Sequence, residues 1–447
     1  MNTDAKRQST SRISAELYRR AKRVIPGGTN LLSKRPERFL PDHWPAYYSR
    51  AKGNEVWDLD GRRLIDMVSA GCGTCLLGAA DPDVNAAVKQ VIDHGSMATL
   101  NPPEEVRLAE LLSEIHPWAD MARFARSGGE SNAIAVRIGR AFTQKSKIAF
   151  CGYHGWHDWY LAANLSADSA LDGHLMPGLD VAGVPRSLVG TALPFRYNHV
   201  EDLEQIVAEH GPDLGVIIME PMRFTEPASG FLENVRDIAT RLGAVLIFDE
   251  INIGFRHGLG GIHQQLGVEP DIAVYAKVLS NGYAMGAVVG RGPVMQAAQT
   301  TFISSSYFTE RIGPAAAVAT IEKMKRENVQ DRVVSIGQRV REAWLRTADK
   351  HGINLTVHGR PALMSMAMDY ADETAALRTL FTQEMLDRGF IAGMWVYPNF
   401  TMTDWIIDDY FVALDEVFAL LADAIDNRNI SSRLRGPVAH ADFRRLT

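Results

Sequence analysis

Between residues 83 and 290, short apolar runs alternate with longer stretches of helical periodicity. The apolar runs lie at 123–125, 147–150, 215–219, 244–248, 272–275 and 287–289. The helical stretches lie at 83–93, 103–115, 131–142 and 232–242. Strands that are apolar throughout and separated by helices predict an α/β fold with a mostly parallel sheet buried on both faces. Ligands of such a sheet bind beyond the carboxyl ends of its strands.

The start of the chain has a different pattern. Residues 12–24 show helical periodicity with a basic face, and Ile25-Pro-Gly-Gly28 stops that helix. Alternating residues on both sides of Asp60-Gly61 predict a hairpin over residues 54–67.

The end of the chain, after residue 325, is mainly helical. The pattern there adds strand-like pieces near 355–357 and 363–368, and an amphipathic helix at 409–426. We expect a small α+β domain formed by both chain ends together, and a large domain between them. The predicted boundaries are residues 1–65, 66–325 and 326–447.

Composition excludes several classes of protein. The chain has 447 residues, 46% of them hydrophobic and 22% charged, with a net charge of -6. This balance favours a globular protein and gives no basic footprint for nucleic acid. No apolar run approaches the ~20 residues that a membrane span requires. The first fourteen residues lack the apolar core of a secretory signal, so we expect a cytoplasmic protein.

Cysteine and histidine patterns give little support for a metal or a disulfide framework. The three cysteines are Cys72, Cys75 and Cys151. A sparse, odd number of cysteines fits a reducing compartment. The C-x-x-C pair at 72–75 has no second pair to complete a zinc site, and His154 and His157 lie in an aromatic loop without further ligands. We therefore predict no metal.

The candidate chemistry begins with Lys277 and Asp249. Each follows an apolar run, so each is expected at the carboxyl edge of the sheet. A lysine there can form a Schiff base with an aldehyde cofactor, and an aspartate can keep the ring nitrogen of that cofactor protonated. This division of roles is typical of pyridoxal phosphate (PLP) chemistry.

Three further strand ends carry polar or aromatic residues. Ser127-Gly-Gly-Glu130 opens a helix and offers backbone amides to a phosphate. The spacing of Ser127 and Glu130 also fits a capping box, and a helix can have both features. Tyr153 follows the run at 147–150 and is our candidate for stacking on a flat ring. Glu220 closes the run at 215–219, and its carboxylate could orient groups around the ring or face water.

Taken in their order along the chain, the segments that contain these residues resemble those of the class III PLP-dependent aminotransferases, most closely the glutamate-1-semialdehyde aminomutase-like branch. The resemblance covers residues 15–425. The segments that carry it are Ala21–Gly28, Asp58–Gly61, Ser127–Glu130, Tyr153–Gly155, Glu220-Pro221, Phe248–Arg256, Gly260-Gly261, Gly267–Asp271 and Ala276–Gly282.

The resemblance implies the fold type I architecture, with a mostly parallel seven-stranded sheet, a small domain from both chain ends, and a homodimer with active sites at the interface. It implies that Lys277 is the Schiff-base lysine and that Asp249 contacts the ring nitrogen. It places the remaining cofactor contacts at Ser127, Gly128 and Gly129 for the phosphate, at Tyr153 and Ile251 on the two ring faces, and at His154 and Glu220 around the ring. For Arg256, an anion contact and a structural ion pair are both open.

The chain departs from the family pattern at residues expected to bind the phosphate and at residues expected to bind the substrate. Gly129 replaces a residue that usually carries a hydroxyl, and either Ser306 or Thr309 could supply the hydroxyl that reaches the phosphate of the neighbouring subunit. The N-terminal arginine of true aminomutases is displaced, which makes Lys34 and Arg35 the candidates for substrate binding. The C-terminal glutamate of those enzymes is missing from Pro398–Thr401.

We therefore expect an aminotransferase with L-glutamate as the donor and an aldehyde or ketone as the acceptor. Trp156 and its polar neighbours suit a hydroxylated ligand, so an oxidised sugar or aminoglycoside of amino-sugar or antibiotic biosynthesis is the preferred acceptor. The alternatives are a glutamate-1-semialdehyde 2,1-aminomutase and a PLP-dependent epimerase or dehydratase acting on an amino sugar. A non-catalytic binding protein would lack Lys277 or Asp249, and both are present.

Overall fold

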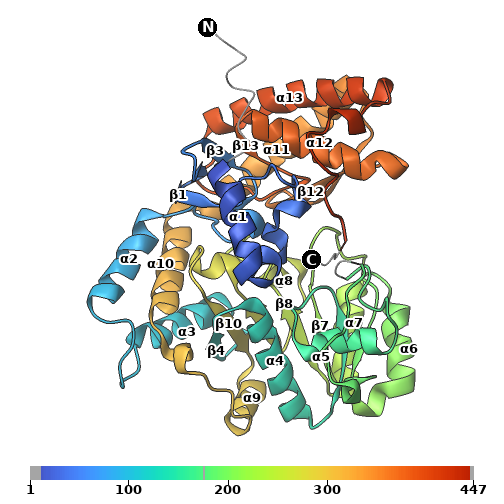
Figure 1. The fold of residues 1–447 in the computed structure, drawn as a ribbon. Coiled ribbons are helices and arrows are strands. Elements are labelled where there is room, and N and C mark those ends of the chain that lie inside the picture. The colour runs from blue at the N-terminus through green and yellow to red at the C-terminus, as the bar shows by residue number, and fades with distance from the viewer. Residues whose placement is uncertain (1–11, 175–176, 443–447) are drawn as a thin grey trace. The chain divides into compact units, whose positions relative to one another are not determined.

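The computed structural model describes residues 12–174 and 177–442, which form two compact units (Figure 1). Unit 1 combines the described residues up to Asp81 with those from Asp331, and unit 2 is Pro82–Gln330. The boundaries expected at residues 65 and 325 stay a prediction of domain organisation. Eleven of the fourteen residues tested for a secretory signal lie outside the described residues.

Unit 2 contains a seven-stranded sheet in the order β4-β10-β9-β8-β7-β5-β6. Its strands are β4 (Met121–Ala125), β5 (Lys147–Cys151), β6 (Ala192–Pro194), β7 (Leu214–Met219), β8 (Val245–Asp249), β9 (Ile272–Tyr275) and β10 (Gly286–Gly290). Strand β10 pairs antiparallel with β4 and β9, whereas the other pairs are parallel. The predicted mostly parallel sheet is confirmed.

Two features of this sheet depart from the sequence pattern. Strand β6 was not among the expected strands, because three residues ending in a proline give no apolar run. Strand β10 follows β9 without an intervening α-helix, so the chain reverses through the short turn at Lys277–Ser280 instead of crossing over. A parallel neighbour would need a longer crossover connection.

Alternate residues of each central strand face opposite layers of unit 2. Ile148 and Phe150 belong to the apolar cluster that includes residues of α4 (Gly128–Thr143). Ala149 and Cys151 belong to the cluster that includes residues of α7 (Phe231–Leu242). Both faces of the sheet are therefore covered, as the apolar runs predict.

The other α-helices of unit 2 agree closely with the expected helical stretches where these exist. They are α2 (Pro82–Asp93), α3 (Pro103–Ile115), α5 (Asp158–Leu161), α6 (Val200–His210), α8 (His263–Leu266), α9 (Gly292–Met295) and α10 (Ile312–Glu327). Helix α11 (Val329–His351) then carries the chain from unit 2 into unit 1.

Unit 1 contains two small sheets that use both ends of the chain. The first has the order β1-β2-β3-β13 and the second the order β11-β12-β14. The strands are β1 (Tyr48–Lys52), β2 (Glu55–Asp58), β3 (Arg63–Asp66), β11 (Leu355–Arg360), β12 (Leu363–Met368), β13 (Phe390–Ile391) and β14 (Trp395–Val396). Strands β2 and β3 form the predicted hairpin, and β13 pairs with β3 from the other end of the sequence.

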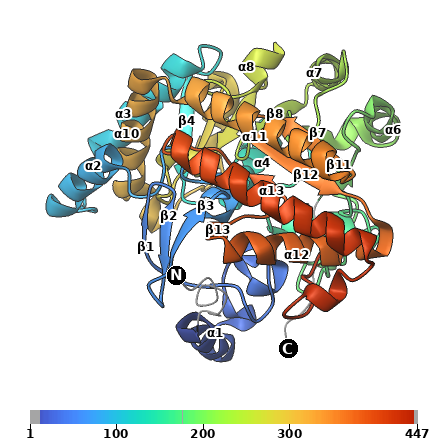
Figure 2. The same ribbon diagram turned by 90° about the horizontal axis from the view of Figure 1, so that it is seen from above.

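The helices of unit 1 are α1 (Arg12–Val24), α11, α12 (Thr374–Asp387) and α13 (Asp404–Asp426). Helix α13 begins five residues before the expected stretch. Helices α11, α12 and α13 pack side by side (Figure 2) around a core that includes the buried Trp344, whose indole N–H donates to the Tyr410 hydroxyl at 2.9 Å. Within the described part of the chain, no helix combines the length and the apolar character that a membrane crossing needs.

Candidate active site

Lys277 is the first residue of the tight turn that follows β9. Its backbone has a φ of +49°, a left-handed conformation that costs a non-glycine residue about 1–3 kcal/mol and occurs preferentially at functional sites. The side chain is half-buried, and its Nζ donates a hydrogen bond to Oδ1 of Asn252. The turn thus holds the amine at the carboxyl edge of the sheet.

Asp249 is the last residue of β8, and its side chain is only 2% exposed. Its Oδ2 accepts hydrogen bonds from Nδ2 of Asn132 at 2.7 Å and from Nδ1 of His154 at 2.8 Å. Its Oδ1 accepts one from the backbone N–H of Ile251 at 3.0 Å. Three donors on a buried carboxylate offset the loss of hydration and fix its orientation.

The ring of His154 lies between two oxygen acceptors. Nδ1 faces Asp249, and Nε2 lies 3.2 Å from the carbonyl oxygen of Cys151. Both neighbours of the ring are hydrogen-bond acceptors, and the two contacts fix the orientation of the imidazole beside Asp249.

Glu220, the residue after β7, joins two loops of the site. Its Oε2 accepts the backbone N–H of Tyr153 at 3.1 Å, and its Oε1 accepts Nδ2 of Asn252 at 2.7 Å. Nη1 of Arg223 lies 3.7 Å from Oε2. Since the other side of the Asn252 amide contacts Lys277, a hydrogen-bonded chain connects the ends of β7 and β9.

The first turn of α4 departs from the predicted capping box. Ser127 is the N-cap residue, but its side chain makes no capping hydrogen bond. Glu130 instead accepts the backbone N–H of Arg126 at 2.8 Å. The capping-box prediction is therefore wrong in detail, because the glutamate reaches one residue further back. The N-terminal amides of the helix lack a side-chain cap, which suits an anion.

Both glycines at the start of α4 lie against neighbouring side chains. A Cβ on Gly128 would lie 2.9 Å from Cδ1 of Ile251. A Cβ on Gly129 would lie 3.2 Å from Nδ1 of His157, which is buried and has no hydrogen-bond partner. The ring of His157 thus takes the space of the side chain that residue 129 lacks.

Tyr153 and Ile251 are both half-buried and pack against the apolar cluster of the α4 face. Burial raises the pKa of Tyr153, and the nearby Asp249 carboxylate adds to this effect. Its phenol therefore stays neutral, which suits an aromatic ring that stacks on a flat cofactor ring.

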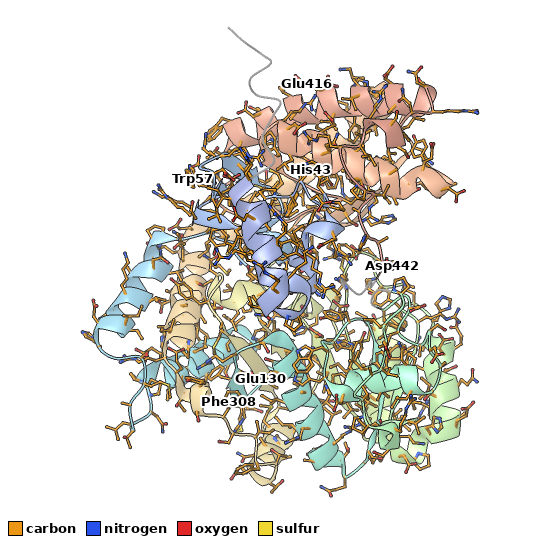
Figure 3. The ribbon with its side chains drawn as sticks, in the orientation of Figure 1. His43, Trp57, Glu130, Phe308, Glu416 and Asp442 are labelled. Carbon is orange, nitrogen blue, oxygen red and sulfur yellow. The ribbon has the colours of Figure 1, made fainter. Side chains whose placement is uncertain are left out.

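The segment with Ser306 and Thr309 is tied to the start of α4 through Arg126. The guanidinium of Arg126 donates to the carbonyl oxygens of Phe308 at 3.1 Å and Glu310 at 2.5 Å. Figure 3 labels one residue of each of these two segments, namely Glu130 at the start of α4 and Phe308 in the segment with Ser306 and Thr309. Ser306 is exposed and Thr309 half-buried, so both hydroxyls stay candidates for a contact across a dimer.

The predicted substrate-binding residues belong to different segments of the chain. Trp156 is 70% exposed and stacks on His157. In unit 1, Lys34 is exposed and lies beside the 69–73 turn, and Arg35 lies against Gly27. Thr401, at the position of the missing glutamate, donates to Asn54 and Asn399 within unit 1.

A second buried polar cluster adjoins the site. Glu250 accepts hydrogen bonds from the backbone N–H and Nδ1 of His263, and Nε2 of His263 accepts the indole N–H of Trp118. Next to it, Nε2 of His116 accepts the hydroxyl of Tyr275 at 2.8 Å. Burial lowers the pKa of His116 to about 4, so this ring is neutral near pH 7.

Sequence reasoning missed three residues of this region, which are Asn132, His157 and Asn252. Asn132 lies four residues after Gly128, so helical spacing places it one turn into α4 on the same face as Gly128, and there it contacts Asp249. Asn252 and His157 lie in loops, where spacing does not predict direction. Among the described residues, no group of three or more His, Cys, Asp or Glu side chains could hold a metal ion.

The residues fit PLP. An amine, a buried carboxylate and an uncapped helix N-terminus with two glycines meet at one edge of the sheet, and they match the aldehyde, ring nitrogen and phosphate of this cofactor. Fold and site together define a PLP-dependent transferase. Residues 41–418 match the family model for class-III aminotransferases, and the chain belongs to this family.

Three relatives of this chain have different activities in their names. The 3-aminobutyryl-CoA aminotransferase of Cloacimonas acidaminovorans is 31% identical, over 83% of this chain and 88% of its own. The glutamate-1-semialdehyde 2,1-aminomutase of Ignicoccus hospitalis is 35% identical, over 74% and 78% of the two chains. The 2'-deamino-2'-hydroxyneamine transaminase of Streptomyces kanamyceticus is 30% identical, over 75% and 81%.

A solved transaminase structure with PLP bound has the same fold. It superposes with a TM-score of 0.83 at 26% identity, and the match covers 93% of this chain and 99% of the other. The predicted fold of the chain, a mostly parallel seven-stranded sheet with a small α+β domain from both chain ends, is thus confirmed. The enzyme class, a PLP-dependent aminotransferase, follows from the family.

Proposed function

We propose that this chain transfers an amino group from L-glutamate to an aldehyde or ketone, and that the preferred acceptor is an oxidised sugar or aminoglycoside. Bound PLP supplies an aldehyde that accepts the amino group and a ring that withdraws electrons. The observation that carries the proposal is the meeting of Lys277, Asp249 and the start of α4 at the carboxyl edge of one sheet.

Each residue has a stated task in this proposal. The amine of Lys277 binds the cofactor and, once released, moves the proton at the carbon that bears the amino group. Asp249 accepts the ring N–H, and His154 and Asn132 hold its carboxylate in place. Ser127, Gly128 and Gly129 bind the phosphate, and Tyr153 and Ile251 pack on the two ring faces.

The acceptor assignment is supported by one relative and by the aromatic loop. The Streptomyces kanamyceticus transaminase has an aminoglycoside named in its activity. In this chain, Trp156 presents an exposed ring next to His157 and Asp158, and an aromatic face flanked by polar side chains suits the C–H surface and hydroxyls of a sugar.

The test is a titration of the purified protein with L-glutamate, followed by the visible absorbance of the lysine-bound cofactor. We expect this band to decline with glutamate and to return when an oxidised aminoglycoside is added. The Lys277→Ala variant should lack the band and the turnover. A band that glutamate leaves unchanged would refute the donor, and turnover by Lys277→Ala would refute the role of the lysine.

A second candidate is an aminomutase reaction on glutamate 1-semialdehyde, which is favoured by relatives of up to 35% identity with that name. Such an enzyme moves the amino group within one molecule and needs no separate acceptor. Incubation with the semialdehyde alone, followed by NMR of the product, distinguishes the two reactions. Isomerisation without a second substrate would favour the aminomutase.

We also propose a homodimer with shared active sites. Among the described residues of unit 2, four large apolar side chains are at least 67% exposed in the single chain, namely Leu100, Trp156, Phe302 and Tyr307. Light scattering should give the mass of two chains, and Phe302→Asp should reduce it. Within the dimer, a loss of PLP affinity in Ser306→Ala or in Thr309→Val would identify the hydroxyl that contacts the phosphate.

A further inference from the structure

We infer that Asn252 is a positioning residue that holds the amine of Lys277, and that Glu220 determines which side of the Asn252 amide faces the amine. This inference rests on the proposed role of Lys277 as the cofactor-binding lysine. It assigns a role beside that lysine to two residues, of which Asn252 follows β8 and Glu220 follows β7.

The hydrogen bonds of the Asn252 amide have a defined direction. A carboxylate accepts hydrogen bonds only, so Nδ2 of Asn252 must face Oε1 of Glu220, at 2.7 Å. The amide oxygen then points the other way, where it accepts the hydrogen bond of Lys277 Nζ. With a neutral amide in place of Glu220, nothing in this pair would prevent the Asn252 amide from turning.

Both Asn252 and Glu220 are held in place by their surroundings. Asn252 is 8% exposed and Glu220 is 5% exposed, so water competes little for their hydrogen bonds. The backbone of Asn252 is held by Nε of the buried Arg256, which donates to its carbonyl oxygen at 2.5 Å. Glu220 is held in turn by the backbone N–H of Tyr153.

The consequence concerns the lysine when its amine is free. An amide oxygen beside the amine accepts one of its N–H groups and leaves the nitrogen lone pair aimed elsewhere. A turned amide would present an N–H group to the same amine and disfavour its protonated form. The orientation of Asn252 therefore affects both where the amine lies and at which pH it reacts.

The experiment measures the acylation of Lys277 in the full-length protein freed of PLP, as a function of pH, by peptide mass spectrometry. Capture of added PLP is then followed by visible absorbance. Asn252→Leu should lower the pH midpoint of acylation and slow PLP capture roughly tenfold, since it removes the acceptor. Glu220→Gln should also lower the midpoint, because it lets the amide turn.

The double variant E220Q/N252D should shift the midpoint in the opposite direction, upward by about 1–3 pH units relative to E220Q, because a carboxylate then faces the amine. A general structural disturbance would not give opposite shifts. Asn164→Asp is the matched control, because Asn164 is another buried asparagine of unit 2, with partners in Leu171 and Leu179. Its midpoint should equal that of the wild type.

Superimposed profiles for wild type, N252L and E220Q/N252D would overturn the role of Asn252, and so would shifts of the same direction in both variants. Failure of the proposed function has a different signature. The wild-type protein would then show no visible band with PLP, or Lys277→Ala would retain it, whatever the acylation profiles of the Asn252 variants.

Discussion

Asp249→Asn is the substitution that tests the site most directly. The carboxylate accepts three hydrogen bonds, from Asn132, His154 and the backbone of Ile251. An asparagine has one oxygen and one NH₂ group in the same space. If its oxygen keeps the two contacts on the Oδ2 side, its NH₂ group faces the N–H of Ile251, so one buried donor loses its partner.

The magnitudes follow from these contacts. A buried donor without a partner costs about 1–3 kcal/mol, and the free energy of unfolding should fall by that amount. The proposed hydrogen bond between this carboxylate and the ring nitrogen of PLP would be charge-assisted and worth about 1.5–3 kcal/mol. Its loss should weaken PLP binding about 10- to 100-fold, and the rate of the glutamate half-reaction should fall about 100-fold or more.

The assay compares D249N with Asp271→Asn. Asp271 precedes β9, at the opposite end of the strand from Lys277, and accepts hydrogen bonds from Leu246 N and Arg236 Nη1. Urea unfolding should show a loss of stability in both variants, whereas a PLP titration should show weaker binding in D249N alone. Equal PLP affinity in D249N and wild type would refute the role of Asp249, and an equal loss in D271N would mean that the effect is only structural.

Three other predictions concern stability and thiol chemistry. Burial lowers the pKa of His116 from 6.5 to about 4, so below about pH 6.5 the unfolded chain binds a proton that the folded chain does not bind. About 3 kcal/mol of stability should therefore be lost as the pH falls from about 6.5 to about 4. Urea unfolding at the two pH values should show this loss in the wild type and not in His116→Gln. Gly337→Ala would place Cβ 2.0 Å from the carbonyl oxygen of Pro361 and should destabilise the protein by about 1–3 kcal/mol in thermal unfolding, whereas Gly393→Ala meets open space and should not. Burial raises the pKa of Cys151 and also that of Cys75, so a thiol reagent should label Cys72 first in the native protein and all three cysteines after denaturation; rapid labelling of native Cys151 would contradict its buried position.

The sequence was most informative where a pattern repeats. The central strands and the helices at 12–24 and 103–115 could be predicted because burial on both faces, or on one helical face, leaves a periodic signal. Strand β6 left no such signal, since it is three residues long and ends in proline. The antiparallel direction of β10 depends on how the turn after Lys277 folds, which no apolar pattern records.

Some residues of the candidate site could likewise be predicted from the sequence, and others could not. Lys277, Asp249 and Glu220 could be placed because the end of a buried strand defines where a side chain lies. Asn252 and His157 could not, because they lie in loops whose direction depends on partners from other strands. The capping box failed for a related reason, since Ser127 and Glu130 have the required spacing but the side chain of Glu130 finds the N–H of Arg126 instead.

The pairing of β13 with β3 has a consequence for the order in which the chain can fold during its synthesis. Strand β3 ends at Asp66, whereas its partner Ile391 is synthesised 325 residues later. At about 5–20 residues per second, the N-terminal part of unit 1 waits for tens of seconds without its sheet partner. All of unit 2 is synthesised within that interval. The nascent chain therefore has an exposed β-strand edge at its front while its central sheet is already complete, and this edge is where a chaperone would be needed.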